Sequence, residues 1–155
     1  MTASREFLKP SSAEQFLNRA FGFMVGLGVG PSYCYLLQVR GRKTGKLYST
    51  PVYLMDLQGK LVLVAPRGKT QWVRNAEASG EITLKRGRYR KRFHLEPIGV
   101  PEKLAILEQY LNRFKAAVQR YFSVQAGSPP AAFAEVADGF PVFALAEIQR
   151  SPPSS

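Results

Sequence analysis

A short basic segment of the chain combines the residue types that bind phosphate groups. It reads Gly41-Arg42-Lys43-Thr44-Gly45-Lys46. A guanidinium, an ammonium, a hydroxyl and turn amides can converge on one phosphate, so Arg42, Lys43 and Thr44 are candidate phosphate ligands. The alternative is a solvated basic hairpin that binds nothing.

The strand that follows this segment carries a proline in its interior, in the run Ser49-Thr50-Pro51-Val52. Proline has no N–H for a sheet ladder, so within strands it marks an edge or a bulge. Pro51 can therefore hold the strand open for a flat ring system to lie against its backbone. An edge strand without a ligand is the alternative.

Two further stretches have the composition of a binding site. The first ends an apolar strand in a cationic turn, Val64-Ala65-Pro66-Arg67-Gly68, and the second opens a helix with Gln71-Trp72-Val73-Arg74-Asn75. Taken alone, they indicate a loop and a helix anchored by a tryptophan. Next to a basic hairpin, they can form the wall of a pocket.

The sequence lacks the motifs on which several classes of chemistry depend. One cysteine and one histidine cannot supply a disulfide framework or an ordinary zinc site, so we expect no metal. The glycines at positions 26, 28 and 30 follow a helix and not a strand, which argues against a dinucleotide fingerprint. Nucleophile elbows and Walker loops are absent as well. If the protein is an enzyme, a cofactor must carry its chemistry.

The formal net charge of +11 over 155 residues indicates an anionic partner, which could be a polyanionic ligand, nucleic acid or a membrane surface. The charge is concentrated in residues 40–46 and 85–92. No signal peptide is evident, and the apolar run 21–29 is too short to span a bilayer. We therefore expect a cytoplasmic protein.

Most of the chain has the pattern of consecutive antiparallel strands. We expect strands at 32–40, 47–56, 61–65, 81–85, 88–97 and 141–145, the first five forming a meander. There is no alternation of strands and helices typical of a doubly wound fold. The sequence predicts a small antiparallel barrel within a single domain, residues 1–149, followed by a disordered tail at 150–155.

Helical periodicity occurs before, between and after these strands. An amphipathic helix is predicted from Ala13 to Leu27, packing on the barrel or resting on a membrane surface. A short helix is expected at 70–79, and a longer one begins at Pro101 with an apolar stripe that ends at Tyr121. A further helical turn is expected near Phe133.

In order and spacing, the three stretches together resemble the deazaflavin-dependent nitroreductase family, which is similar to quinone reductases that use coenzyme F420. The resemblance extends from Phe16 to Leu145 and includes the Trp-x-Arg-Asn helix start, the Ala-Ser-Gly turn and the closing Pro141-Val142-Phe143. It implies an α+β split β-barrel of the FMN-binding type, with six mostly antiparallel strands and flanking helices. The loop from Arg67 to Trp72 is shorter than in the nitroimidazole-activating branch.

The resemblance also implies a role for each stretch. Arg42, Lys43 and Thr44 would hold the phosphate region of F420, and Ser49, Thr50, Pro51 and Val52 would line its ring. Backbone groups of Val64, Ala65, Pro66, Arg67 and Gly68 would face the deazaflavin, with Trp72, Arg74 and Asn75 closing the pocket. FMN is the alternative cofactor.

The leading hypothesis is an F420H2-dependent oxidoreductase that transfers a hydride to a quinone, nitro or conjugated acceptor, with Tyr121 as the candidate proton donor. A non-catalytic carrier of a flavin or lipid-like ligand is the second. Nucleic-acid binding through residues 85–92 is disfavoured, because Tyr89 and Phe93 share a strand face expected to point inward. A small-molecule acceptor is the expected partner, with a homodimer and peripheral membrane contact through residues 13–27 left open.

Overall fold

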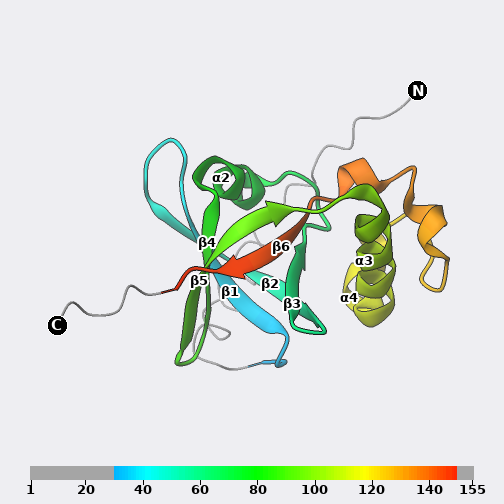
Figure 1. Ribbon diagram of the computed structural model, residues 1–155, viewed down its shortest axis with the longest axis horizontal. Coiled ribbons are helices and arrows are strands. Elements are labelled where there is room, and N and C mark those ends of the chain that lie inside the picture. The colour runs from blue at the N-terminus through cyan, green and yellow to red at the C-terminus, as the bar shows by residue number, and fades with distance from the viewer. Residues whose placement is uncertain (1–29, 150–155) are drawn as a thin grey trace.

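The computed structural model describes residues 30–149, whose six strands close into an antiparallel barrel (Figure 1). The strands are β1 (Cys34–Arg40), β2 (Leu47–Leu57), β3 (Lys60–Val64), β4 (Glu81–Arg86), β5 (Tyr89–Pro97) and β6 (Val142–Glu147). Their order around the barrel is β1-β2-β3-β6-β5-β4. The prediction of a six-stranded antiparallel barrel with flanking helices is confirmed.

The connection from β3 to β4 does not follow the predicted meander. Helix α2 (Gln71–Ser79) carries the chain across, and β4 then pairs with β1 and β5 instead of β3. The free edge of β3 is taken by β6, the last strand in the sequence. Barrel closure requires each strand to have two neighbours, and this long-range pairing leaves no local signal in the sequence.

The interior of the barrel is filled by apolar side chains from several strands. Leu37 of β1 lies opposite Leu84 of β4, and Ile82 lies opposite Phe93. The interior cluster consists of Leu37, Val39, Leu54, Leu63, Ala76, Ile82, Leu84 and Phe93, with half-buried residues such as Val52, Trp72, Tyr89 and Leu145 packed against it. Because Ala76 and Trp72 belong to α2, this helix packs against the interior cluster and adjoins the site described below.

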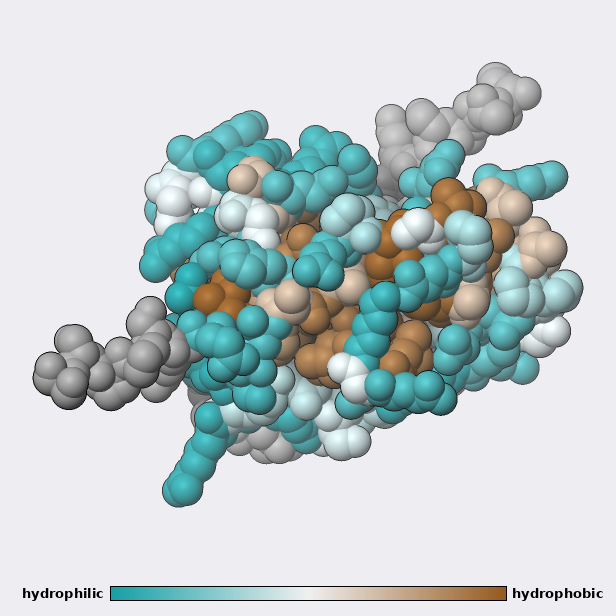
Figure 2. All heavy atoms as spheres, viewed as in Figure 1, coloured by the Kyte–Doolittle hydropathy of each residue, from teal (hydrophilic) through white to brown (hydrophobic). Residues whose placement is uncertain are grey.

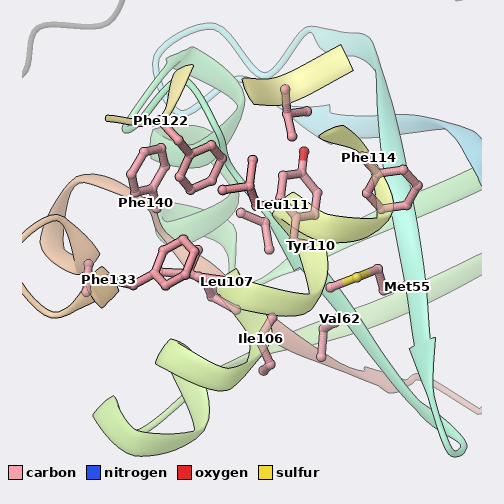
Figure 3. Close-up of a cluster of buried hydrophobic side chains, with 14 residues drawn as sticks. Met55, Val62, Ile106, Leu107, Tyr110, Leu111, Phe114, Phe122, Phe133 and Phe140 are labelled. Carbon is pink, nitrogen blue, oxygen red and sulfur yellow. The ribbon is translucent and has the colours of Figure 1, made fainter. Parts of the chain in front are cut away.

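A second core lies between the outer face of the barrel and helix α3 (Val100–Arg113) (Figure 3). Met55 of β2 and Val62 of β3 share this cluster with Ile106, Leu107 and Leu111 of α3. Val62 and Leu63 are both buried and belong to opposite clusters. This explains why the β3 sequence is apolar without alternation: one face fills the barrel and the other supports α3.

The predicted helix that starts at Pro101 does not continue to Tyr121. It ends at Arg113 and is followed by α4 (Lys115–Val118) and the 3-10 turn η1 (Gln119–Tyr121). Phe114 leaves helical geometry with φ −112° and ψ 27°. Its ring packs 4.9 Å from those of both Tyr33 and Tyr53, so aromatic packing on the β1–β2 side accompanies the interruption. The apolar stripe is continuous, but the helix is not.

Further 3-10 turns, η2 (Pro130–Phe133) and η3 (Ala137–Gly139), lead into β6. The first confirms the helical turn expected near Phe133. The predicted helix at 13–27 and the tail at 150–155 lie outside the described residues. Within residues 30–149, no helix is long and apolar enough to cross a membrane.

Figure 2 shows hydrophilic residues around the margin of one face and apolar residues in its middle. Among the described residues, large exposed apolar side chains are few: Leu47, Tyr48 and Val100. Two of these three directly follow the basic hairpin, which makes that end of the barrel both cationic and locally apolar.

Candidate functional site

Strand β2 has an open edge at the residues expected to line the ring. Residues 47–53 pair with β1, but pairing with β3 begins only at Leu54. Pro51 lies in the part of β2 that has no partner on the β3 side, as expected for a residue without an N–H. Thr50 pairs with the interior residue Leu37, so Thr50 and Val52 share the inner face while Ser49 and Pro51 point outward. A ring can therefore meet all four residues only along the backbone edge.

The basic segment forms the hairpin that joins β1 to β2. Gly41 N donates to Lys46 O at 2.7 Å, and Lys46 N donates to Thr44 Oγ1 at 3.2 Å. A Cβ on Gly41 would lie 2.6 Å from Cε2 of Tyr48, so the tyrosine ring rests directly on the hairpin backbone. The side chains of Arg42, Lys43 and Lys46 emerge from a turn that is fixed by its own hydrogen bonds.

Asn75 connects this hairpin to α2. Its side chain is 4% exposed, and Oδ1 accepts from Arg42 N at 3.0 Å and from Arg42 Nη1 at 2.8 Å. Gln71 Oε1 accepts from the same Nη1 at 3.0 Å. Asn75 was expected to close the pocket, and in the structure its amide oxygen holds Arg42, 33 residues away in the sequence. Two of the three predicted stretches are thus in direct contact.

In the turn between β3 and α2, two backbone amides donate hydrogen bonds to carbonyl groups of the protein itself. Ala65 N donates to Pro141 O at 2.8 Å, and Gly68 N donates to Ala65 O at 3.2 Å. These two amides are engaged inside the protein, which differs from the expectation that the turn offers them to a ring. Gly68 instead allows the turn to adopt a left-handed backbone conformation, with φ +82°.

The same turn holds two buried polar atoms that lack a partner within residues 30–149. They are Nε of Arg67 and Oγ1 of Thr70, the residue that precedes α2. Buried polar atoms are nearly always hydrogen-bonded, and an exception requires an explanation such as a missing ligand. These atoms, together with the hairpin cations, suit a polar, negatively charged group near the N-terminus of α2.

Replacing Gly68 by alanine should destabilise this turn. We expect the free energy of unfolding to fall by about 1–2 kcal/mol, because a side chain at φ +82° brings Cβ too close to the following carbonyl. Chemical denaturation measures the loss. Gly68→Asn should lose less, since asparagine tolerates left-handed geometry. An alanine variant as stable as the parent protein would contradict the conformational role.

Trp72 and Arg74 lie on different sides of α2. Trp72 packs against the interior cluster, with its ring 6.4 Å from that of Phe143. Arg74 is exposed, and its Nε donates to Lys69 O at 3.2 Å. Trp72 therefore stands between the barrel interior and the turn, whereas Arg74 supports the turn from outside.

Tyr121 belongs to a group of phenols near the end of the open edge. Its Oη accepts from Arg120 Nη2 at 2.6 Å, and that guanidinium lies 4.7 Å from the tyrosine ring centroid. Burial raises the pKa of Tyr53, and the nearby Cys34, Tyr33 and Tyr121 raise it further. Burial likewise raises the pKa of Tyr110. Tyr53 and Tyr110 are thus held neutral, while Tyr121 faces a cation.

Two residues of this site were not predicted from the sequence. Gln71 lies in one of the candidate stretches but was given no role, and Arg120 had no signal because its partner is its own neighbour at a turn that was predicted to be helix. Cys34 is buried, and burial raises the pKa of its thiol. Phe93 is 1% exposed inside the barrel, so the aromatic platform that nucleic-acid binding would need is not available at this position.

No metal-binding group of three or more histidine, cysteine, aspartate or glutamate residues occurs in the part of the chain that the structure describes. An antiparallel barrel with one open edge, a basic hairpin and a helix N-terminus beside it defines a split-barrel protein of the FMN-binding type. Within that class, the family model of F420H(2)-dependent quinone reductases matches residues 15–128. The chain belongs to this family.

Solved structures support the fold. One, described as a domain-swapped dimer, is 18% identical with a TM-score of 0.54, covering 86% of this chain and 93% of that one. An F420-H2 dependent reductase, FDR-A, is 17% identical with a TM-score of 0.53, covering 76% and 97%. The protein Atu2129 of unknown function from Agrobacterium tumefaciens is 17% identical with a TM-score of 0.53, covering 92% and 58%. No curated protein sequence matches the chain.

Proposed function

We propose that this protein is an F420H2-dependent reductase that passes a hydride to a quinone, nitro or other conjugated acceptor. The observation that carries the proposal is the contact between the basic hairpin and α2, where Arg42 is held at the helix by Asn75 and Gln71. Membership of the quinone reductase family supports the same cofactor. Bound reduced F420 would supply the hydride, and the protein supplies position and charge.

Different residues of the site bind different parts of the cofactor. Arg42, Lys43 and Thr44 bind the phosphate, because the hairpin presents two cations and a hydroxyl on one rigid turn. The open edge of β2 at residues 49–52 receives the ring. The turn at residues 64–68 borders the ring, and Nε of Arg67, which is buried and has no partner within residues 30–149, is the candidate donor to the ring carbonyls. Trp72 limits the pocket at the barrel interior.

Tyr121 donates a proton to the acceptor after hydride transfer in this scheme. Loss of the proton leaves negative charge on Oη, which already accepts a hydrogen bond from the Arg120 guanidinium. The same hydrogen bond fixes the position of the hydroxyl, and a positioned side-chain donor is what general acid catalysis requires. Burial raises the pKa values of Tyr53 and Tyr110, so these two remain neutral neighbours.

A side-by-side titration with F420 and FMN tests the proposal. We expect F420 to bind more tightly, because its phosphate and acidic tail carry more negative charge toward the hairpin, and we expect that affinity to fall as salt rises. Equal or tighter binding of FMN would assign the site to the alternative cofactor. Binding of F420 without turnover of any quinone or nitro acceptor would favour a carrier. Homodimer formation and peripheral membrane contact remain further proposals.

The fluorescence of Trp72 should change when F420 is added, since this side chain borders the proposed pocket and is the single tryptophan of the chain. Titration at fixed protein concentration measures the change, and the midpoint should agree with the affinity from cofactor absorbance. An unresponsive Trp72 alongside demonstrated binding would mean that it only anchors α2 to Phe143.

A further inference from the structure

The cation at the centre of the site is held by neutral groups. Arg42 donates to Asn75 Oδ1 through its backbone N and its Nη1, and Nη1 also donates to Gln71 Oε1. Both acceptors are amide oxygens, which hold the guanidinium by hydrogen bonds without adding negative charge. Within residues 30–149, Arg42 has no carboxylate at ion-pair distance.

Some cations of the protein pair with carboxylates, whereas others, such as Arg74 and Arg120, donate to neutral oxygens as Arg42 does. Each of four surface ion pairs joins a lysine or arginine to a carboxylate: Lys60–Glu102, Lys69–Glu77, Lys91–Glu147 and Arg92–Glu81. A carboxylate at position 71 or 75 could hold Arg42 in the same way and would bind it more strongly. It would also cancel the charge that an anionic ligand needs.

We propose that Asn75 and Gln71 form a charge-neutral clamp that positions Arg42 for phosphate while keeping its full positive charge. The inference rests on the proposed function, since the phosphate is that of F420. Asn75 and Gln71 are positioning residues in this scheme, and they act on the ligand through Arg42. Because the two amides are uncharged, Arg42 keeps the positive charge on which the strength and the salt dependence of phosphate binding depend.

The clamp predicts that stability and affinity change in opposite directions. In Gln71→Glu, a carboxylate meets Nη1 of Arg42 and the first turn of α2 gains a negative charge, and both changes stabilise the fold. The same carboxylate competes with phosphate for the guanidinium. A residue with a merely structural role would lose stability and affinity together.

The experiment compares the parent protein with Gln71→Glu and Asn75→Asp. Gln71 is exposed, so its variant should fold even if the buried Asn75→Asp variant does not. For each protein we would measure the melting temperature and the affinity for two probes: F420, and the deazaflavin fragment that lacks phosphate and tail. Gln109→Glu, on α3, makes the same chemical change away from the hairpin.

We expect Gln71→Glu to weaken F420 binding by about tenfold, to flatten its salt dependence and to keep or raise the melting temperature. Affinity for the phosphate-free fragment and the behaviour of Gln109→Glu should match the parent protein. Unchanged F420 affinity in a folded Gln71→Glu variant would overturn the clamp, and so would an equal loss for the fragment. If the parent protein itself does not bind F420, the proposed function fails, which is a distinguishable result.

Discussion

Removal of both hairpin cations in Arg42→Ala/Lys43→Ala should weaken F420 binding by about 100-fold, or roughly tenfold for each charge-assisted hydrogen bond to the phosphate. The two side chains leave a turn whose backbone hydrogen bonds do not depend on them, apart from the clamp to α2. The fold should therefore persist. Titration at low and high salt measures the effect, and the variant should show a much weaker dependence on salt.

The matched control removes two cations from another hairpin. Arg88→Ala/Arg90→Ala takes the same charge from exposed positions at the β4–β5 end of the barrel. If the overall field of the protein attracted the cofactor, both double variants would lose similar affinity. A loss confined to Arg42 and Lys43 identifies the hairpin as the binding element. Full affinity of the Arg42→Ala/Lys43→Ala protein would refute the phosphate assignment.

Turnover should fall by about 100-fold in Tyr121→Phe, the lower end of what general acid catalysis contributes. Phenylalanine keeps the ring beneath the Arg120 guanidinium and removes only the hydroxyl that accepts its hydrogen bond. Cofactor affinity and melting temperature should stay close to those of the parent protein. Steady-state reduction of a soluble quinone by F420H2 measures the rate.

Tyr110→Phe provides the comparison within the same group of phenols. Tyr110 is buried, and burial raises the pKa of its hydroxyl, so it should not release a proton in the working pH range. Its variant should retain most of the turnover. If Tyr121→Phe is as active as the parent enzyme, the proton comes from solvent and Tyr121 serves only to pack η1 against the second core.

Local patterns in the sequence were sufficient to locate the strands. Alternation of apolar and polar side chains, or a short continuous apolar run in the case of β3, located all six to within two residues at each end. The hairpin and the open edge of β2 were also visible, because glycines at the turn and proline inside the strand report backbone requirements that act within a few residues. The break after Arg113 was not visible, since the apolar stripe continues through Phe114 and only its contacts with Tyr33 and Tyr53 distinguish it.

The roles of individual site residues depended on the tertiary structure. Asn75 faces Arg42, and the Gly68 amide donates within its own turn, although the sequence suggested contact with a ligand for both. A motif shows which residue types occur together, but a side chain's partner depends on what the fold brings near it.

The sequence by itself thus determined the elements, the antiparallel class and the chemistry available to the site, because these depend on interactions between near neighbours in the chain. Only the tertiary structure decided the strand order, with β6 inserted between β3 and β5, and the use of Asn75 and Gln71 to hold Arg42. Both features join residues far apart in the sequence, and their geometry exists only once the barrel has closed.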